Sequence, residues 1–447
     1  MKKNNQSKKI AADPFDRIRQ PFRRFTKIES AGGILLIVAT VLALIIANSG
    51  WANIYESLWK LEFTIGTDEF HLTEPILAWI NDGLMAIFFF LVGLEIKREL
   101  LAGELSSPKK AALPIIAALG GMVVPALIFV FFNKGTNAIT GWGIPMATDI
   151  AFSIGILSLL GKRVPLALKV FLVAFAIVDD IGAIVVIALF YSAHIHWAAL
   201  FIALALLALL FVFNSLNIKY LPLYILTGLV IWFLFLEAGI HPTIAGVLVA
   251  FSVPANRKIL LHDFNLKMSN NLEDFENKPG HHPIVLSHGQ LAAIDNMQSQ
   301  LNKVQSPLQK LEHGLHGFVT FFVMPVFAFA NAGVVLGGAG LATFNTLTLS
   351  IAGSLVFGKI AGIFLFSFLT VKLGLSALPD KVNWHHIFGA GILGGVGFTM
   401  SLFISNLAYD NHLLINEAKL GILLGSLVAA LFGYFYLRIY LSRNKEI

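Results

Sequence analysis

Four ionisable side chains fall in the middle of long apolar stretches of this sequence: Asp149, Asp179, Asp180 and Lys359. A charge at the centre of a bilayer costs about 2.5–3.5 kcal/mol on the insertion scale. Such residues are therefore tolerated where they face the interior of a helix bundle or a water-filled cavity. Carboxylate oxygens suit hard cations and can also take up protons. The pattern predicts a membrane-embedded site that holds a cation or protons.

A purely structural salt bridge is the alternative interpretation. Lys359 could neutralise one aspartate and fix helix packing, but two carboxylates would then remain at the same depth. Consecutive residues of a helix point about 100° apart, so Asp179 and Asp180 cannot both face one partner. We expect one of them to face a cation site shared with Asp149, and the other to face the helix that carries Lys359.

The composition requires that these residues belong to a membrane protein. The chain has 447 residues, of which 57% are hydrophobic and 13% are charged, and its mean hydropathy is +0.77. Soluble domains carry about 25% charged residues, so a soluble or disordered chain is excluded. The net charge of +6 comes from chain ends and short loops, which argues against nucleic-acid binding. The absence of cysteine excludes disulfides, thiolate nucleophiles and iron–sulfur clusters.

Apolar stretches of spanning length predict an all-α polytopic membrane protein with twelve transmembrane helices. They lie near residues 31–48, 76–96, 111–132, 139–160, 165–191, 197–214, 221–237, 240–254, 315–337, 346–371, 386–407 and 419–438. With the N-terminus in the cytoplasm, nearly all of the 32 Lys and Arg residues fall on the cytoplasmic side. The exceptions are Lys60, Lys134 and Lys419 outside, and Lys169 and Lys359 within spans. This asymmetry predicts cytoplasmic termini, by the positive-inside rule.

The polar segments complete the predicted organisation. They are a basic cytoplasmic segment 1–30, a long cytoplasmic loop 255–313 and a cytoplasmic tail 441–447, with helices 1–8 in 31–254 and helices 9–12 in 314–440. The N-terminal outline is similar to that of a signal peptide. Its basic region is longer, however, and Trp51 and Tyr55 stand where a small-residue cleavage site would follow, which favours an uncleaved span.

Two loops carry local patterns. Residues 59–72 alternate apolar and polar side chains around a Gly-Thr-Asp turn, which predicts an outer β-hairpin. An isolated hairpin is marginally stable, so it needs a partner such as the copy in a second subunit. In the long loop, apolar residues recur at helical spacing from Leu291 to Leu311, interrupted by Pro307. This predicts a short helix lying on the membrane or on the protein. This loop also contains three histidines, His281, His282 and His288. They could be metal ligands or solvated side chains.

Two spans are predicted to be interrupted near the buried charges. Pro145 precedes Asp149 by four residues, and five glycines lie between Gly389 and Gly397. Glycines weaken a helix or permit close packing, and close packing alone would also account for the second span. Each interrupted span is the middle member of a trio, and the two trios have opposite topology. That arrangement predicts an inverted-topology repeat whose interrupted helices cross at the midplane of the membrane.

Several motifs along the chain together resemble the NhaA family of bacterial sodium/proton antiporters. They are residues 90–100 (FLVGLEIKREL), 147–149 (ATD), 178–183 (VDDIGA), 311–313 (LEH), 325–333 (PVFAFANAG), 358–359 (GK) and 394–401 (GGVGFTMS). The resemblance covers nearly the whole chain. It implies a transporter of the bacterial inner membrane, not an enzyme, which exchanges internal Na⁺ or Li⁺ for external H⁺. The exchange would be electrogenic and pH-regulated, without a cofactor, in a homodimer joined through the outer hairpin.

The resemblance also implies roles for particular residues. Asp180 corresponds to the principal ligand of Na⁺ or Li⁺. Asp179 corresponds to the second member of that aspartate pair, and it would pair with Lys359. Asp149 and Thr148 would support the site where the interrupted helices cross. The positions that correspond to pH-response residues are Glu95, His241, Glu312, His313 and His316. Two departures from the family pattern, the long loop before Glu312 and the extended basic N-terminal segment, bear on that pH response.

Three other classes of protein are weighed against this one. A sodium-coupled symporter of an organic solute would need a further cluster of buried polar residues, and none is evident in the sequence. A channel fits poorly with paired charges at one depth, which favour an occluded site. An enzyme would need a nucleophile or a metal motif, which the sequence does not show.

Overall fold

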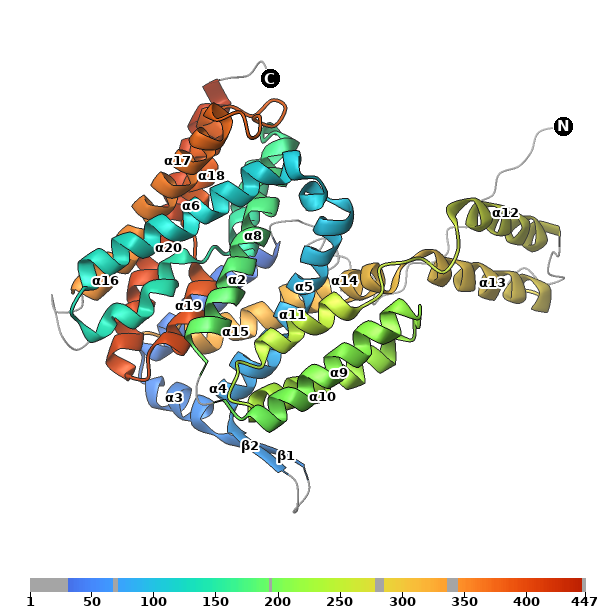
Figure 1. Cartoon of the computed structure of the whole chain (residues 1–447), viewed down its shortest axis with the longest axis horizontal. Coiled ribbons are helices and arrows are strands. Elements are labelled where there is room, and N and C mark those ends of the chain that lie inside the picture. Colours follow the sequence, from blue (N-terminus) through green and yellow to red (C-terminus); the bar gives the residue numbers. More distant parts are fainter. Residues whose placement is uncertain (1–30, 67–70, 193–194, 278–284, 336–344, 444–447) are drawn as a thin grey trace.

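The computed structural model describes residues 31–66, 71–192, 195–277, 285–335 and 345–443. In these ranges the chain is a helical bundle with one small antiparallel sheet (Figure 1). Within the described residues, seven helices are long and apolar enough to cross a membrane. They are Ile76–Ala102, α6 (Pro108–Asn133), α8 (Leu166–Phe190), α9 (Trp197–Ser215), Pro307–Asn331, Thr346–Lys372 and α20 (His412–Arg443). Helices suit a bilayer because their backbone groups bond within the segment.

Three of these spans contain a π-helical turn. The first span runs through α4 (Ile76–Ala78), η1 (Trp79–Leu84) and α5 (Met85–Ala102). The turn η5 (Val319–Val323) joins α14 (Pro307–Phe318) to α15 (Met324–Asn331), and η7 (Ser354–Gly358) joins α16 (Thr346–Gly353) to α17 (Lys359–Lys372). Turns of this kind are frequent at functional sites; here η7 ends directly before Lys359.

Three further pairs of helices would each pass as one span if the bend between them is ignored, which brings the number to ten. The pair α2 (Ala31–Ala47) and α3 (Ala52–Lys60) bends by 112°. The pairs η3 (Asn137–Met146) with α7 (Ile150–Leu159), and α18 (Trp384–Gly394) with α19 (Phe398–Ala408), each bend by 43°. These last two breaks lie where Pro145 and the glycines predict interruptions. Two shorter apolar helices are α10 (Leu221–Glu237) and α11 (Thr243–Ser252).

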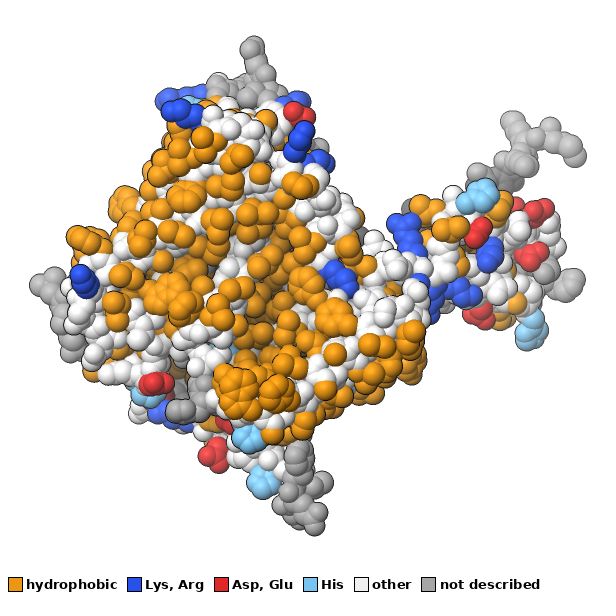
Figure 2. Space-filling model, in the orientation of Figure 1, with side chains coloured by type: hydrophobic (Ala, Val, Ile, Leu, Met, Phe, Trp, Pro, Cys, Tyr) orange, Lys and Arg blue, Asp and Glu red, His pale blue; other side chains and the backbone are white. Residues whose placement is uncertain are grey.

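The bundle surface matches that of a membrane protein. In Figure 2 hydrophobic side chains cover most of the visible bundle face, while charged side chains gather at its upper edge, around the hairpin and on a projecting arm. The arm consists of α12 (Leu261–Asn277) and α13 (His288–Val304), which pack against each other (Figure 1). An apolar band bounded by charged ends is the surface that a lipid bilayer covers.

The structure corrects several predicted boundaries. Helix α12 was not predicted within the loop 255–313. The apolar stripe around Pro307 forms two helices, and α14 begins at Pro307, inside that predicted loop, because Ser306 and Gln309 form a capping box and proline suits the first helical turn. The span that contains α14 ends at Asn331, whereas the sequence predicted its end near residue 337. Helix α20 begins at His412, before the predicted residue 419, so Lys419 is buried in the helix and not in an outer loop.

The predicted hairpin is present as two strands, β1 (Glu62–Gly66) and β2 (His71–Pro75). They pair antiparallel, with Thr64 opposite Thr73. The side chain of Trp79 donates a hydrogen bond to the Phe63 carbonyl (3.0 Å), which ties the sheet to the start of the next span. All residues of β1 are exposed. The turn between the strands lies outside the described residues, as do segment 1–30, most of the tail and the candidate metal ligands His281 and His282.

Helices α6 and α17 pack at backbone contact through Gly120 and Gly362. A Cβ atom added at Gly362 would lie 2.6 Å from the Gly120 carbonyl carbon and still closer to its oxygen. Both partners are backbone, so neither can turn away. We expect Gly362→Ala to lower the free energy of unfolding by about 1–3 kcal/mol, the usual cost of overpacking, measured as a lower thermal midpoint in detergent. Gly353→Ala on the same span, where an added Cβ meets nothing, is the control; equal midpoints for the two variants would refute this close contact.

Candidate functional site

The site is built where the two helix breaks meet. The backbone N–H of Asp149, in the break before α7, donates to the Val396 carbonyl in the break before α19 (2.7 Å). The Thr148 hydroxyl donates to the Gly394 carbonyl (2.8 Å). A Cβ atom added at Gly397 would lie 2.9 Å from the Ala147 carbonyl oxygen, so glycine permits this approach. The interruptions thus bind each other through backbone groups that intact helices would not expose.

Asp149 joins the N-termini of two helices. One carboxylate oxygen accepts a hydrogen bond from the Phe152 backbone N–H (2.9 Å) and so caps α7. The other oxygen accepts from the Thr399 hydroxyl (2.5 Å) and from the Thr399 backbone N–H (3.2 Å) at the start of α19. Helix N-termini favour negative charge, so this geometry stabilises a buried carboxylate without a basic partner.

Lys359 pairs with Asp179 in the bundle interior, and both side chains are fully buried. The Lys359 ammonium donates to the two Asp179 oxygens (2.9 and 3.1 Å), to the Thr148 hydroxyl (2.9 Å) and to the Met146 carbonyl. All the donors of this lysine therefore have acceptors. Of the two consecutive aspartates, Asp179 is the one that faces Lys359.

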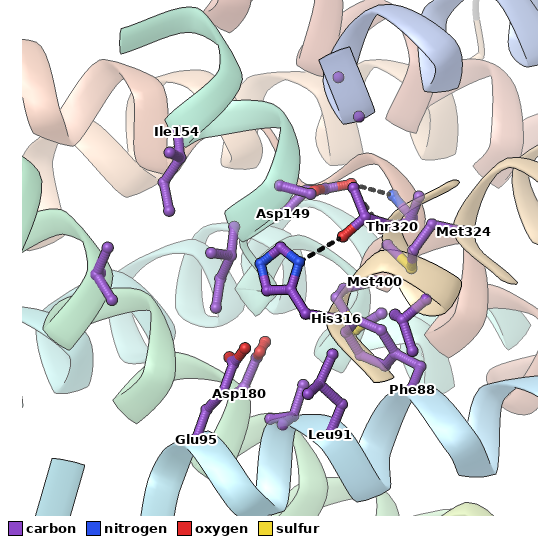
Figure 3. Close-up of a pocket in the computed structure, with 18 of the residues that line it drawn as sticks. Phe88, Leu91, Glu95, Asp149, Ile154, Asp180, His316, Thr320, Met324 and Met400 are labelled. Carbon is purple, nitrogen blue, oxygen red and sulfur yellow. Dashed lines mark hydrogen bonds between the residues drawn. The ribbon is translucent and has the colours of Figure 1, made fainter. Parts of the chain in front are cut away.

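Asp180 points the other way, into a cavity of about 300 Å³. Its side chain is 1% exposed, and neither carboxylate oxygen has a hydrogen-bond partner among the described residues. Figure 3 shows Asp180, Asp149 and Glu95 around this cavity. A buried carboxylate without donors is costly, so Asp180 requires a proton, a cation or ordered water. This unsatisfied acid, beside Asp149, is the chemical centre of the cavity.

Charged residues also line the cavity toward the arm. Arg98 on α5 forms an ion pair with Glu312 on α14 (2.5 Å) and one with its neighbour Glu99 (2.9 Å). Glu95, one turn before Arg98, also lines the cavity, and in the view of Figure 3 its carboxyl group is drawn next to that of Asp180. His316 lines the same cavity and its ring contacts the Thr320 hydroxyl (3.3 Å).

The remaining predicted residues lie elsewhere. His313 is exposed on α14 and is not part of the cavity lining. His241 lies between α10 and α11, where its Nε2 is 2.6 Å from the Tyr191 carbonyl oxygen, again outside the lining. Among the described residues no group of three or more His, Asp or Glu side chains forms a metal site, so nothing gathers around His288.

Two residues of the site were not predicted individually. Thr399 makes two of the hydrogen bonds to Asp149, and Arg98 pairs with Glu312. The available signal for Thr399 was its place directly after the glycine-rich break, which is where a helix N-terminus would begin. For Arg98 the sequence held no comparable signal, because its partner is more than two hundred residues away.

Comparison of the sequence with known proteins identifies the family of this chain. The family described as "Na+/H+ antiporter 1" matches residues 23–437. A Na(+)/H(+) antiporter NhaA of Oleidesulfovibrio alaskensis is 49% identical over 438 residues, covering 98% of this chain and 97% of the relative. The NhaA of Koribacter versatilis is 48% identical (96% and 93% covered), and that of Bacteroides thetaiotaomicron is 44% identical (96% and 99%). With matches of this extent, the chain belongs to the Na+/H+ antiporter 1 family, and it is a membrane transporter and not an enzyme.

Proposed function

We propose that this protein exchanges internal Na⁺ or Li⁺ for external H⁺ across the bacterial inner membrane. The observation that carries the proposal is Asp180, a buried carboxylate that faces a cavity beside Asp149 and has no hydrogen-bond donor in the described part of the chain. Such a group is stabilised by a positive species, and a proton and an alkali ion are the two that the exchange would supply. The family membership and the names of the relatives agree with this exchange.

Competition for the same oxygens is the proposed mechanism. Protonated Asp180 and Asp179 release protons on the cytoplasmic side, and the bared carboxylates bind Na⁺ with Asp149. The occupied or protonated site then switches its access to the other side. If one cation replaces two protons, each cycle moves one net charge, which is worth about 2.3 kcal/mol per 100 mV. The membrane potential would then help to expel sodium.

Lys359 has a supporting role in this scheme. Its ammonium neutralises Asp179 after the proton has left and before a cation binds, because it donates to both carboxylate oxygens. When Na⁺ enters beside Asp180, its charge competes with that of the lysine for Asp179. Thr148 positions the lysine, since its hydroxyl accepts from the ammonium and donates to the second broken span.

The proposed topology has twelve spans that cross the inner membrane, with both termini in the cytoplasm. Seven long helices, two helix pairs broken near the site, α2 and the two short helices α10 and α11 supply these spans. The two interrupted spans would cross at the midplane, within an inverted repeat. The cavity lining of Glu95, Arg98 and Glu312 then opens toward the cytoplasm.

Residues at the cytoplasmic end of the cavity are proposed to regulate exchange with pH. Glu95, Glu312 and His316 line the cavity, and the ion pair between Arg98 and Glu312 joins α5 to α14 at this end. His313 adjoins this group on α14, and His241 contacts the end of α8 through the Tyr191 carbonyl. We expect a pH-dependent change of charge in this group of residues to alter how easily cations enter the cavity.

A homodimer joined through the outer hairpin is the proposed assembly. A two-stranded sheet is marginally stable alone, and both of its edges offer unpaired backbone groups. In Figure 1 the strands project from the bundle, and β1 is fully exposed. Pairing with the hairpin of a second copy would satisfy one edge.

The test is dequenching of a pH-sensitive dye in proteoliposomes after addition of Na⁺, Li⁺ or K⁺ at several pH values. We expect Na⁺ and Li⁺ to restore fluorescence. As pH falls below the titration range of the aspartates, the apparent affinity for Na⁺ should weaken by about tenfold per pH unit for each competing proton, because cation ligands must be deprotonated. An affinity that does not vary with pH would refute competition, and the absence of Na⁺-dependent dequenching at every pH would refute exchange.

A further inference from the structure

The proposed exchange, on which this inference rests, requires a barrier between the cavity and the hairpin end of the bundle. Three phenylalanines from three helices meet there: Phe89 on α5, Phe327 on α15 and Phe403 on α19. All are fully buried, and the Phe403 ring lies 5.4 Å from Phe89 and 6.3 Å from Phe327, measured between centroids. This set is called the phenylalanine layer below.

The phenylalanine layer lies directly beyond the cavity. Each of its helices also contributes a cavity-lining residue close to the phenylalanine in sequence: Phe88, Met324 and Met400. The layer itself is not part of the lining. Three buried aromatic rings offer a cation no oxygen ligand, so we take the layer as the barrier on this side of the site in the conformation described here.

The same three helices each carry an asparagine further toward the hairpin end: Asn81 in η1, Asn331 at the end of α15 and Asn406 on α19. The Asn406 amide donates to the Asn331 side-chain oxygen (2.6 Å), and the Asn331 amide donates to the Asn81 side-chain oxygen (2.9 Å) and to the Phe327 carbonyl (3.1 Å). Asn331 is fully buried. We call these residues the asparagine triad.

The location of the triad follows from its neighbours. Asn81 comes shortly after β2, and the Tyr55 hydroxyl of α3 donates to the Phe329 carbonyl, two residues before Asn331 (2.5 Å). The order from the arm to the hairpin end is therefore Glu312, cavity, phenylalanine layer, asparagine triad. A path for ions from Asp180 along these three helices would meet the triad next.

We propose that the asparagine triad is a transient alkali-cation site on the exit path, which the phenylalanine layer separates from Asp180. Amide oxygens are neutral oxygen ligands, which suit hard cations but release them more readily than carboxylates. Phe403 and Asn406 both lie beyond the break at residues 395–397, on α19. A rotation of α19 about that break would part Phe403 from Phe89 and free the Asn331 oxygen from Asn406 in one movement.

Single cysteines test this site, because the natural chain has none. In proteoliposomes, Asn406→Cys should react with a membrane-impermeant, positively charged methanethiosulfonate from the hairpin side during Na⁺-driven turnover. Modification should then slow exchange by about tenfold or more, since a fixed positive charge repels a nearby cation, while a negatively charged reagent should slow it less. Ser57→Cys, exposed on α3, reports the sidedness of the reagent.

The matched control is Asn133→Cys. Asn133 is also a buried asparagine; its amide donates to the Phe129 carbonyl of its own helix α6 and to the Ser350 hydroxyl of α16. Its variant should neither react nor lose exchange. Should Asn406→Cys itself be inactive, Met400→Cys combined with Phe403→Ala serves instead: the reagent should reach the cavity from the hairpin side, which Met400→Cys alone should not allow without turnover.

The outcomes separate the two proposals. If the unmodified chain lacks Na⁺-dependent exchange, the proposed function fails. If exchange is present but Asn406→Cys stays unreactive during turnover while Ser57→Cys reacts, the exit site is overturned and the exchange stands. Equal inhibition by the positive and the negative reagent would show a steric effect, and would overturn the cation site.

Discussion

Na⁺/H⁺ exchange is expected to fall below detection in the Asp180→Asn variant. The amide that replaces the carboxylate cannot lose or gain the transported proton and offers the cation no negative charge. The change is isosteric, and Asp180 makes no hydrogen bond that the variant would lose among the described residues. The thermal midpoint in detergent should therefore hold or rise, because a neutral amide costs less to bury than an unpaired carboxylate. Dye dequenching in proteoliposomes measures the exchange.

Asp410→Asn is the control for that experiment. Asp410 is also an aspartate, but it is exposed in the connection between α19 and α20, so its variant should exchange at the rate of the natural chain. Sodium-coupled proton flux that persists in Asp180→Asn would remove Asp180 from the mechanism. A matching loss in both variants would point to damage from reconstitution.

Lys359→Met is expected to lower the free energy of unfolding by about 3–5 kcal/mol, the cost of leaving one partner of a buried ion pair alone. The lost ammonium donates to both oxygens of Asp179, and both side chains are fully buried. The thermal midpoint in detergent measures the change. The double variant Asp179→Asn, Lys359→Met should regain most of the loss, because no uncompensated charge remains.

Lys60→Met provides the matched ion-pair control. Lys60 pairs with Glu56 at 2.6 Å, but both side chains are about two-thirds exposed (68% and 66%). Exposed pairs contribute only about 0–1 kcal/mol, so this variant should unfold close to the natural midpoint. Two results would show that the buried pair does not stabilise the fold as expected. One is a midpoint shift in Lys359→Met no larger than that in Lys60→Met, and the other is a double variant that is less stable than Lys359→Met.

Features that depend on local pattern were predictable from the sequence. The apolar stretches predicted the helices because hydrophobic length sets which segments can cross a bilayer. Pro145 and the glycines around residue 395 predicted the two breaks, since these residues weaken helices wherever they stand. The alternation around residue 65 predicted the hairpin strands. Helix α12 was not predicted because its sequence is polar overall. Its few apolar residues have a packing partner only once α13 lies beside it.

Helix ends were less predictable than helix positions. The start of α14 at Pro307 depends on a capping box formed by Ser306 and Gln309, which moves the boundary into a segment polar enough to resemble a loop. Lys419 illustrates the same limit, because a lysine near the end of an apolar stretch is normally placed in water. Here α20 continues past it.

The sequence by itself determined that three acids and one lysine are buried in a membrane bundle, because the cost of an isolated charge in lipid forces them inward. It also determined that Asp179 and Asp180 point apart, since helical geometry sets that angle. Helical spacing alone left open which of them faces Lys359; the family resemblance implied Asp179, and the tertiary structure places Asp179 against the lysine. Only the tertiary structure decided that Thr399 on a distant break caps Asp149, and that Asp180 is left without a donor among the described residues. These outcomes depend on how each helix is oriented against its neighbours. The spacing of residues within one helix does not determine that orientation.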